Sequence, residues 1–252
     1  MYFYMHRLNL FLILSEIFKR ENFAMILKNW DSLPEYMRTD EVKKYYDILC
    51  KRKGSLAVKR VFDIVVSFIM LILLSPVFIV VAIMIKTDSK GPVFYRQVRV
   101  TQYGKKFKIF KFRTMVNNAD KIGAHVTSNN DSRITKVGAK IRDCRLDEIP
   151  QLINVFLGDM SFVGTRPEAV RYVEQYTPEM YATLLLPAGV TSEASIIYKD
   201  EARLLEEADN ADEVYVNKIL PDKMKYNLRS LRKFSFISDI KTMFRTVFAV
   251  LK

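Results

Sequence analysis

The longest apolar run of the chain covers residues 64–85, where 22 consecutive residues carry no charge. About 20 predominantly apolar residues suffice for a helix to cross the hydrocarbon core of a bilayer. Ser75 and Pro76 stand in the middle of the run. Because proline removes a backbone donor and clashes with the preceding helical turn, we expect a membrane helix that bends or breaks at this step.

Basic residues flank the run on both sides, with Lys59 and Arg60 before it and Lys86 directly after it. Basic flanks prefer the cytoplasmic side of a membrane. Both flanks stay there if the helix enters, turns at the break and leaves through the same face, which favours a re-entrant hairpin over 55–90. A kinked full span and a buried helix of a soluble core are the alternatives. Asp63 lies one helical turn after Lys59 and Arg60, where a local ion pair is expected.

The next segments change character. PVFYRQVRV and KKFKIFKFR alternate apolar and basic residues around TQYG, a pattern typical of a β-hairpin closed at Gly104. The basic face of this hairpin is either solvated or turned toward phosphates or lipid headgroups. Further on, apolar residues at helical spacing predict a helix that begins close to Asp147 and ends at Gly158.

The two ends of the chain are also expected to be helical. Residues 1–54 have the pattern of an appended helical module, with short amphipathic stretches. Toward the other end, one apolar stripe with nearby cations predicts an amphipathic helix over 236–252. Such a helix lies either in the membrane interface or on the core of the protein itself. The stripe consists of Ile237, Ile240, Met243, Phe244, Val247, Phe248 and Leu251.

Charge narrows the range of partners. The 252 residues carry a formal charge of +12, and residues 51–113 hold fourteen Lys or Arg against only Asp63 and Asp88. This excess indicates an anionic partner, and charge alone admits nucleic acid, anionic lipid and phosphorylated small molecules. The two cysteines, Cys50 and Cys144, are far apart, which fits free thiols and not a disulfide framework or a metal-ligand pattern.

Two adjacent carboxylates, Asp147 and Glu148, are the strongest candidates for chemistry. An Asp before a helix commonly caps it, and that is the alternative reading. Here, however, Arg142 precedes the pair and Arg166 follows it, and guanidinium groups hold phosphate oxygens in a fixed fork. One carboxylate can attack phosphorus while its neighbour binds Mg²⁺, which suits phosphate chemistry.

Other reaction classes fit poorly. The sequence contains no Asp-x-Asp, no phosphate-binding loop of the G-x-x-x-x-G-K-[ST] type and no G-x-G-x-x-G. Its only histidines are His6 and His125, which disfavours a His-based triad or a zinc site.

Three segments stand out together with a shorter one near the end of the chain: KRVFDIVVSFIMLILLSPVFIVVAIMIKTDSKGPVFYRQVRV, FKIFKFRTM and RLDEIPQLINVFLGDMSFVGTRPE, followed by FSFISDIKTMF. These segments closely resemble the bacterial sugar transferase family, the monotopic polyprenyl-phosphate phosphoglycosyl transferases. The similarity extends from Lys59 to Arg171 and resumes weakly near the end of the chain.

The resemblance implies a reaction and its residues. Family members transfer a sugar 1-phosphate from a UDP-sugar to undecaprenyl phosphate, release UMP and start a surface glycan such as a capsular polysaccharide or exopolysaccharide. By carry-over, Asp147 attacks the β-phosphorus and holds the phosphosugar covalently, and Glu148 helps to bind Mg²⁺. Arg142 and Arg166 match family positions that bind phosphate.

The resemblance also implies a location. Ser75 and Pro76 match the break of the family's re-entrant helix, and Lys59, Arg60 and Asp63 match the point where that helix enters the membrane. The expected partners are the UDP-sugar, undecaprenyl phosphate and the cytoplasmic (inner) membrane of a bacterium, with the catalytic domain on its cytoplasmic face. No nucleic acid is expected, and a homodimer is left open.

The expected fold class is α+β and mainly helical, with a small β-hairpin and interfacial amphipathic helices around a cytoplasmic catalytic core. The chain departs from many family members at 186–201, where LPAGVTSEASIIYKDE replaces a segment with Trp and Gly-Arg, so the sugar is not predicted. The expected parts are an N-terminal helical extension (1–54), a re-entrant membrane helix (55–90), a cytoplasmic catalytic domain (91–235) and a C-terminal amphipathic helix (236–252).

Two other functions fit the same residues. A membrane-anchored basic adaptor would recruit polyanions or proteins without catalysis, and its binding would weaken with salt. A membrane phosphatase would use Asp147 to transfer phosphoryl groups to water and not to a lipid phosphate.

Overall fold

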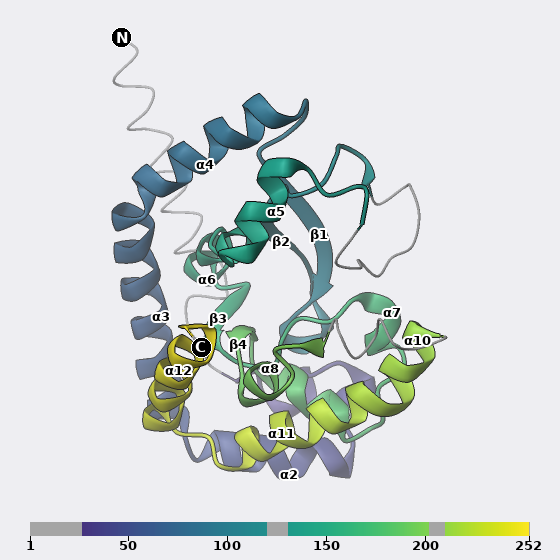
Figure 1. The fold of residues 1–252 in the computed structure, drawn as a ribbon. Helices are drawn as coiled ribbons and strands as arrows, with labels where there is room; N and C mark the ends of the chain where they lie inside the picture. Colours follow the sequence, from purple (N-terminus) through teal and green to yellow (C-terminus); the bar gives the residue numbers. More distant parts are fainter. Residues whose placement is uncertain (1–26, 120–130, 202–209, 252) are drawn as a thin grey trace.

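The computed structural model describes residues 27–119, 131–201 and 210–251, so His125 and the first part of the N-terminal extension lie outside it. The described residues form a mainly helical fold with two small two-stranded sheets (Figure 1). The elements are α2 (Asp40–Cys50), α3 (Lys53–Leu73), α4 (Ser75–Asp88), β1 (Phe94–Val100), β2 (Lys106–Phe112), α5 (Lys136–Asp143), α6 (Gln151–Leu157), β3 (Met160–Val163), α7 (Val170–Val173), β4 (Ala188–Thr191), α8 (Glu193–Ile197), α10 (Ala211–Val214), α11 (Leu220–Arg232) and α12 (Phe236–Leu251).

The apolar run folds into two helices, α3 and α4, bent by 59° where they meet at Leu74. In the described part of the chain no single helix has the length and hydropathy of a membrane span, whereas this bent pair together does. The Ser75 hydroxyl donates to the carbonyl of Ile72 at 2.7 Å, which satisfies a carbonyl at the bend. Pro76 lies in the first turn of α4, where its missing N–H removes no helical bond.

Helix α3 is fastened to the rest of the protein by buried cations. Arg60 donates to the carbonyls of Val155 (2.8 Å) and Phe156 (3.1 Å) at the end of α6. Lys59 donates to the carbonyl of Val163 at 2.8 Å. Arg60 thus binds carbonyls in the last turn of α6, where cations are favoured, and Lys59 binds the carbonyl at the end of β3.

The ion pair expected within α3 between Asp63 and Lys59 or Arg60 is wrong. Lys59 instead pairs with Asp239 of α12 at 2.5 Å. Asp63 accepts a hydrogen bond from the backbone N–H of Phe162 in β3 at 3.2 Å. The one-turn spacing permits a local pair, but Phe162 of β3 binds Asp63 and Asp239 of α12 binds Lys59 instead.

The far end of α4 is held in the same manner. Arg113, which follows β2, donates to the carbonyls of Ser89 (2.7 Å) and Lys90 (3.0 Å). The Asp88 carboxylate accepts from the N–H of Val137 in the first turn of α5 at 3.1 Å. Both ends of the bent pair are therefore tied to the elements that carry the candidate site.

Strands β1 and β2 form the expected antiparallel hairpin, with Gly104 at a positive φ of 76° in the connection. Helix α6 joins the edge of this sheet through the buried side chain of Asn154. Its Oδ1 accepts from the Phe110 N–H at 2.8 Å, and its Nδ2 donates to the Lys108 carbonyl at 3.1 Å. The carboxamide thus replaces a neighbouring strand at an edge that would otherwise be unpaired.

A second sheet, which the sequence pattern did not indicate, pairs β3 and β4 in parallel with Met160 opposite Ala188. Gly164, the residue after β3, is in close contact with Gly189 of β4. A Cβ on Gly189 would lie 2.1 Å from the backbone nitrogen of Gly164, so neither position has room for a side chain. This crossing fixes where the segment after β3 leaves the sheet.

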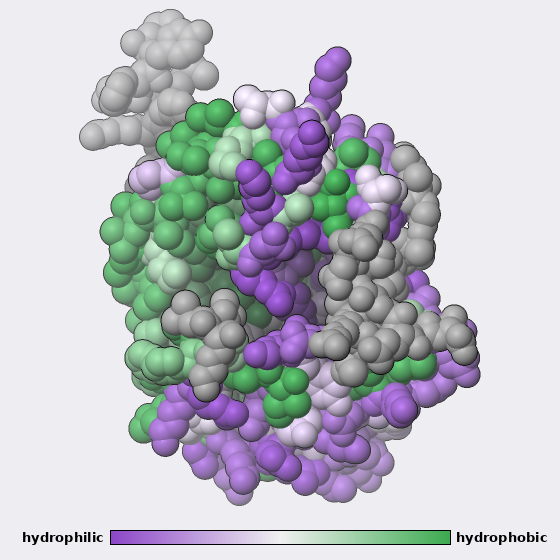
Figure 2. Space-filling view, in the orientation of Figure 1, coloured by the Kyte–Doolittle hydropathy of each residue, from purple (hydrophilic) through white to green (hydrophobic). Residues whose placement is uncertain are grey.

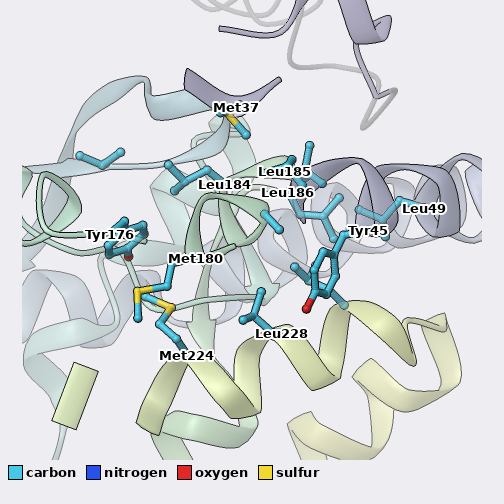
Figure 3. Close-up of a cluster of buried hydrophobic side chains, with 14 of the residues drawn as sticks. Met37, Tyr45, Leu49, Tyr176, Met180, Leu184, Leu185, Leu186, Met224 and Leu228 are labelled. Carbon is cyan, nitrogen blue, oxygen red and sulfur yellow. The ribbon is translucent and has the colours of Figure 1, made fainter. Parts of the chain in front are cut away.

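The largest hydrophobic core lies at the opposite end from α4 and includes residues of the N-terminal extension. Met37, Tyr45 and Leu49 pack with Leu185 and Met224 in one buried cluster (Figure 3). The cluster combines segments that are far apart in the sequence, because α2 packs against residues 180–185 and α11. The four-part division of the chain stays a prediction.

Hydrophobic side chains remain exposed on one side of the molecule, over α3 and α4 (Figure 2). Helix α12 continues this surface: it contacts α3, β3 and β4 on one side and exposes apolar residues on the other. Docking of the amphipathic helix on the protein is therefore confirmed, and its insertion in a membrane interface stays a prediction that the exposed apolar face supports. That face consists of Ile237, Phe244, Val247 and Phe248.

Replacing Asn154 by Leu leaves the N–H of Phe110 without a partner, while the Lys108 carbonyl keeps its hydrogen bond from Arg96 at 3.1 Å. One orphaned donor costs about 1–3 kcal/mol, so we expect the free energy of unfolding to fall by about that much and the thermal midpoint to fall by roughly 2–12 °C. Gln151→Leu is the matched control, because Gln151 is equally buried and its Nε2 has no hydrogen-bond partner in the described structure. Equal midpoints for the two variants, measured by thermal denaturation in detergent, would contradict the role assigned to Asn154.

Candidate active site

Asp147 and Glu148 lie in a single 3₁₀ turn, Leu146–Glu148, between α5 and α6. Arg145 opens the turn in the left-handed conformation (φ 55°), which costs a non-glycine residue roughly 1–2 kcal/mol. Helix α6 begins only at Gln151, later than predicted, and no side chain caps its N-terminus. Capping of α6 therefore does not explain the two acids.

Glu148 is held between two cations that come from separate parts of the chain. Lys111 of β2 places its Nζ 2.7 Å from Oε1, and Arg166, which follows β3, places Nη2 at 2.5 Å from the same oxygen. About a quarter of the Glu148 side chain is exposed. Burial by itself raises the pKa of Glu148, but the charges and hydrogen bonds of Arg166 and Lys111 outweigh it and hold the pKa well below its usual range.

Asp147 has the opposite environment. Burial raises its pKa, and the neighbouring charge of Glu148 adds to this, while the charges of Lys111 and Arg142 oppose it. Within the described residues its carboxylate receives no side-chain hydrogen bond. Adjacent carboxylates with diverging pKa values commonly have different roles in an active site. Here one acid is locked in an ionic clamp, and the other is partly desolvated and available.

Arg142 reaches the site from the last turn of α5. Its Nε donates to the Thr114 hydroxyl at 2.9 Å. Helix α5 sits directly on the backbone of Thr114, because a Cβ on Gly138 would lie 2.0 Å from the Thr114 carbonyl oxygen. Thr135 caps the same helix by accepting from the N–H of Gly138 at 3.0 Å. The position of Arg142 thus depends on a close helix approach that only glycine permits.

Arg166 lies in a segment fixed from both sides. The crossing of Gly164 and Gly189 holds its beginning, and the Gly189 N–H donates to the Thr165 carbonyl at 2.8 Å. Its end is held by Glu168, whose carbonyl accepts from the Val100 N–H of β1 at 3.0 Å.

The Glu168 side chain belongs to a buried polar network that sequence reasoning missed. It accepts from the Tyr215 hydroxyl at 2.6 Å and lies 3.5 Å from the Lys223 Nζ. Lys223 also pairs with Glu201 at 2.8 Å. The sequence carried a signal for this network, since Lys223 falls on the buried stripe of α11, one turn after Leu220.

The structure therefore brings Asp147, Glu148 and Arg166 together and places Arg142 close enough to lower the pKa of Asp147. It adds Lys111, which the sequence analysis treated only as part of a basic face. Lys111 has the same strand parity as the buried Phe107 and Ile109, and this parity could have separated it from the exposed Lys106 and Lys108. Ser75, Pro76, Lys59, Arg60 and Asp63 do not enter this cluster and belong to the bent helix pair and its docking.

The family model for bacterial sugar transferases matches residues 54–252, which is more than half of the chain. The chain belongs to the bacterial sugar transferase family. The match contains every residue of the candidate site, and helix α2 lies outside it.

Named relatives of this sugar transferase chain share about a third to two fifths of their residues with it. It is 40% identical over 196 residues to the UDP-glucose:undecaprenyl-phosphate glucose-1-phosphate transferase of Klebsiella pneumoniae, covering 75% of this chain and 39% of that protein. It is 34% identical over 198 residues to the UDP-N-acetylgalactosamine-undecaprenyl-phosphate N-acetylgalactosaminephosphotransferase of Aeromonas hydrophila, covering 77% and 44%. The chain thus spans less than half the length of these two proteins.

Replacing Lys111 by Met removes one of the two cations on Glu148, so we expect a loss of about 1–2 kcal/mol near neutral pH. Because the pKa of Glu148 is lowered by folding, its ion pairs stabilise the protein above the unfolded value near 4.5 and lose this effect as the pH falls through the folded value. The difference in unfolding free energy between the variant and the wild type should therefore shrink as the pH falls. Thermal denaturation of both proteins across a pH series measures this difference.

Lys108→Met is the matched control for this prediction. Lys108 lies on the same strand, but its side chain is exposed and has no carboxylate partner in the described structure. It should leave the thermal midpoint within about 1 °C, in line with a typical surface substitution. A Lys111→Met midpoint as high as that of the Lys108 variant would show that the clamp on Glu148 contributes nothing to stability.

Proposed function

We propose that this chain transfers a sugar 1-phosphate from a UDP-sugar to undecaprenyl phosphate and releases UMP. One observation carries the proposal: the partly buried Asp147 carboxylate lies beside an ionised Glu148 and among the cations Lys111, Arg142 and Arg166. Such a cluster can hold a diphosphate next to a carboxylate nucleophile, because the cations offset the repulsion between anions. The names of the relatives describe the same class of reaction.

The proposed reaction has two displacements at one phosphorus. Asp147 attacks the β-phosphorus, and the bond to the bridging oxygen breaks so that its electron pair leaves with UMP. An oxygen of undecaprenyl phosphate then attacks the same phosphorus and releases the Asp147 carboxylate, which gives the polyprenyl diphosphate sugar. Arg142 and Arg166 bind phosphate oxygens during both steps, since guanidinium forks match that geometry.

Magnesium is the expected cofactor, and the donor set fits it. In the described residues no group of three or more His, Cys, Asp or Glu side chains is arranged around a metal position, so the protein supplies only the two adjacent carboxylates. Mg²⁺ is commonly held by one or two carboxylates together with substrate phosphates. We assign Glu148 as the carboxylate that would hold it. The bound ion would supply positive charge against the diphosphate.

The bent pair α3–α4 is proposed to be a re-entrant membrane helix that enters and leaves through the cytoplasmic face of a bacterial inner membrane. Its apolar surface is exposed, and both of its ends are tied to the elements around Asp147. This arrangement brings the carboxylate close to the depth at which a lipid phosphate would lie. Phosphate chemistry at a membrane also accounts for the +12 charge without a nucleic-acid partner.

Exopolysaccharide or capsule synthesis is the proposed setting. A relative in Rhizobium leguminosarum, 40% identical over 148 residues, is named an exopolysaccharide production protein.

The nucleophile is tested by Asp147→Asn, assayed for UMP release from a panel of UDP-sugars with undecaprenyl phosphate. We expect turnover to fall by about three orders of magnitude or more, as on removal of other covalent nucleophiles. Asp143→Asn is the control, because Asp143 is exposed at the end of α5 and should leave turnover unchanged. Intact-protein mass spectrometry of the wild type with UDP-sugar alone should show a sugar phosphate adduct that the Asp147 variant lacks.

Undiminished UMP release by the Asp147 variant would reject this residue as the nucleophile. Release of phosphate to water without any need for undecaprenyl phosphate would favour the phosphatase alternative instead.

Topology is tested with single cysteines at Lys53 and Lys90, in a variant that lacks Cys50 and Cys144. Both lysines are exposed and flank the bent pair. A re-entrant helix places both on the cytoplasmic side, so an impermeant thiol reagent should label neither in intact spheroplasts and both in inverted vesicles. Labelling on opposite sides would show that the pair crosses the membrane.

A further inference from the structure

One face of the β1–β2 hairpin is directed toward the candidate active site. Lys111 marks that face, because its Nζ contacts Glu148, and Tyr95 is its direct partner across the sheet. Side chains alternate between the two faces of a strand, so Gln97 and Arg99 lie on the same face as Tyr95. The sequence analysis assigned no role to either residue.

Arg99 is a half-buried cation without an acidic partner. Its Nε and Nη2 both donate to Oε1 of Gln97, at 3.2 and 2.7 Å. Among the described residues no carboxylate oxygen lies within 4.0 Å of its guanidinium. A glutamine holds an arginine in place without cancelling its charge, which leaves the remaining N–H groups available to an anion.

Arg99 also lies close to the Arg166 segment. The next residue, Val100, donates its N–H to the Glu168 carbonyl at 3.0 Å, which joins the end of β1 to this segment. Burial lowers the pKa of Arg99, the charge of Glu168 opposes this, and the positive charge of Arg166 lowers it further. The two guanidinium groups therefore repel each other, and an anion bound between them would offset this repulsion.

The direction of the hairpin decides which anion this is. The end with Tyr95 and Lys111 lies next to α4, whereas Arg99 is four residues further along β1, about 14 Å at the usual rise of a strand (Figure 1). Arg99 therefore lies farther from α4 than Lys111 and its partner Glu148 do. With the lipid phosphate approaching from the α4 end, the soluble nucleotide is the ligand that fits the Arg99 end.

We propose that Arg99, oriented by Gln97, binds the phosphate that leaves with the nucleoside, which is the α-phosphate of the UDP-sugar and the phosphate of UMP. This inference rests on the proposed function. When the bond between the β-phosphorus and the bridging oxygen breaks, negative charge accumulates on that phosphate, and a guanidinium placed there stabilises the leaving group. In this assignment Arg166 binds the transferred phosphate, and Arg99 binds the departing one.

The test compares Arg99→Met with Arg96→Met in the full-length chain. Arg96 is on the same strand but on the opposite face, with its guanidinium 3.4 Å from the ring centroid of Phe110 and a hydrogen bond to the Lys108 carbonyl at 3.1 Å. UMP affinity is measured by calorimetry and by product inhibition. Because a hydrogen bond to a charged group is typically worth at least a factor of ten, Arg99→Met should weaken UMP binding about tenfold or more.

Arg99→Met should raise KM for the UDP-sugar by a similar factor and leave KM for undecaprenyl phosphate within about twofold. Arg96→Met should change none of these values. Arg99→Lys keeps the charge and loses the fork, so it should weaken UMP binding by a smaller factor. It also keeps the test decisive if the Met variant folds poorly. Gln97→Leu should weaken UMP binding too, because the guanidinium loses its fixed orientation.

Unchanged UMP affinity and unchanged KM for the UDP-sugar in a folded Arg99→Met protein would overturn the inference. A selective rise in KM for undecaprenyl phosphate would overturn it as well, because it would place Arg99 on the lipid side. A wild type that releases no UMP from any UDP-sugar with undecaprenyl phosphate would instead reject the proposed function, so the two failures have different signatures.

Discussion

The ionic clamp on Glu148 is the interaction on which the site depends. Two adjacent carboxylates in a partly buried turn repel each other, and a single anion there would be costly without compensation. Lys111 and Arg166 solve this for Glu148, because both contact the same carboxylate oxygen from different elements. Asp147 remains outside the clamp with a raised pKa, as a desolvated carboxylate close to cations. The difference between the two acids arises from their contacts, since their sequence context is the same.

The clamp requires β2, the 3₁₀ turn and the Arg166 segment to meet, and each is positioned by polar bonds at the ends of elements. Asn154 joins α6 to the edge of β2, Arg60 joins α3 to the end of α6, and the Gly164–Gly189 crossing directs the chain toward Arg166. The same bonds connect the apolar helix pair to the site. The bent apolar helix pair and the candidate site are thus joined by one set of contacts, which suits the proposed chemistry between a soluble nucleotide and a lipid.

Much of the local structure could be predicted from the sequence. The charge-free run with a Ser-Pro step indicated the bent helix pair, the alternation of 92–113 indicated the hairpin, and the Asp147-Glu148 pair among arginines indicated a cluster of carboxylates and cations. These features succeeded because helix and strand periodicities and proline geometry act over a few residues. Predictions that needed distant partners were less successful: the expected ion pair of Asp63 with Lys59 was replaced by contacts to β3 and α12.

The sequence by itself determined which residue types are present and where the chain bends, and its motifs indicated the family. The tertiary structure alone decided that Lys111 binds Glu148 and that Lys223 is buried against Glu168. It also decided that Arg99 lies near Arg166 with no carboxylate partner among the described residues. The physical reason is that strand parity and helix periodicity assign a side chain to a face, while its charge partner comes from whichever distant segment packs against that face. That packing follows from the contacts of the whole chain.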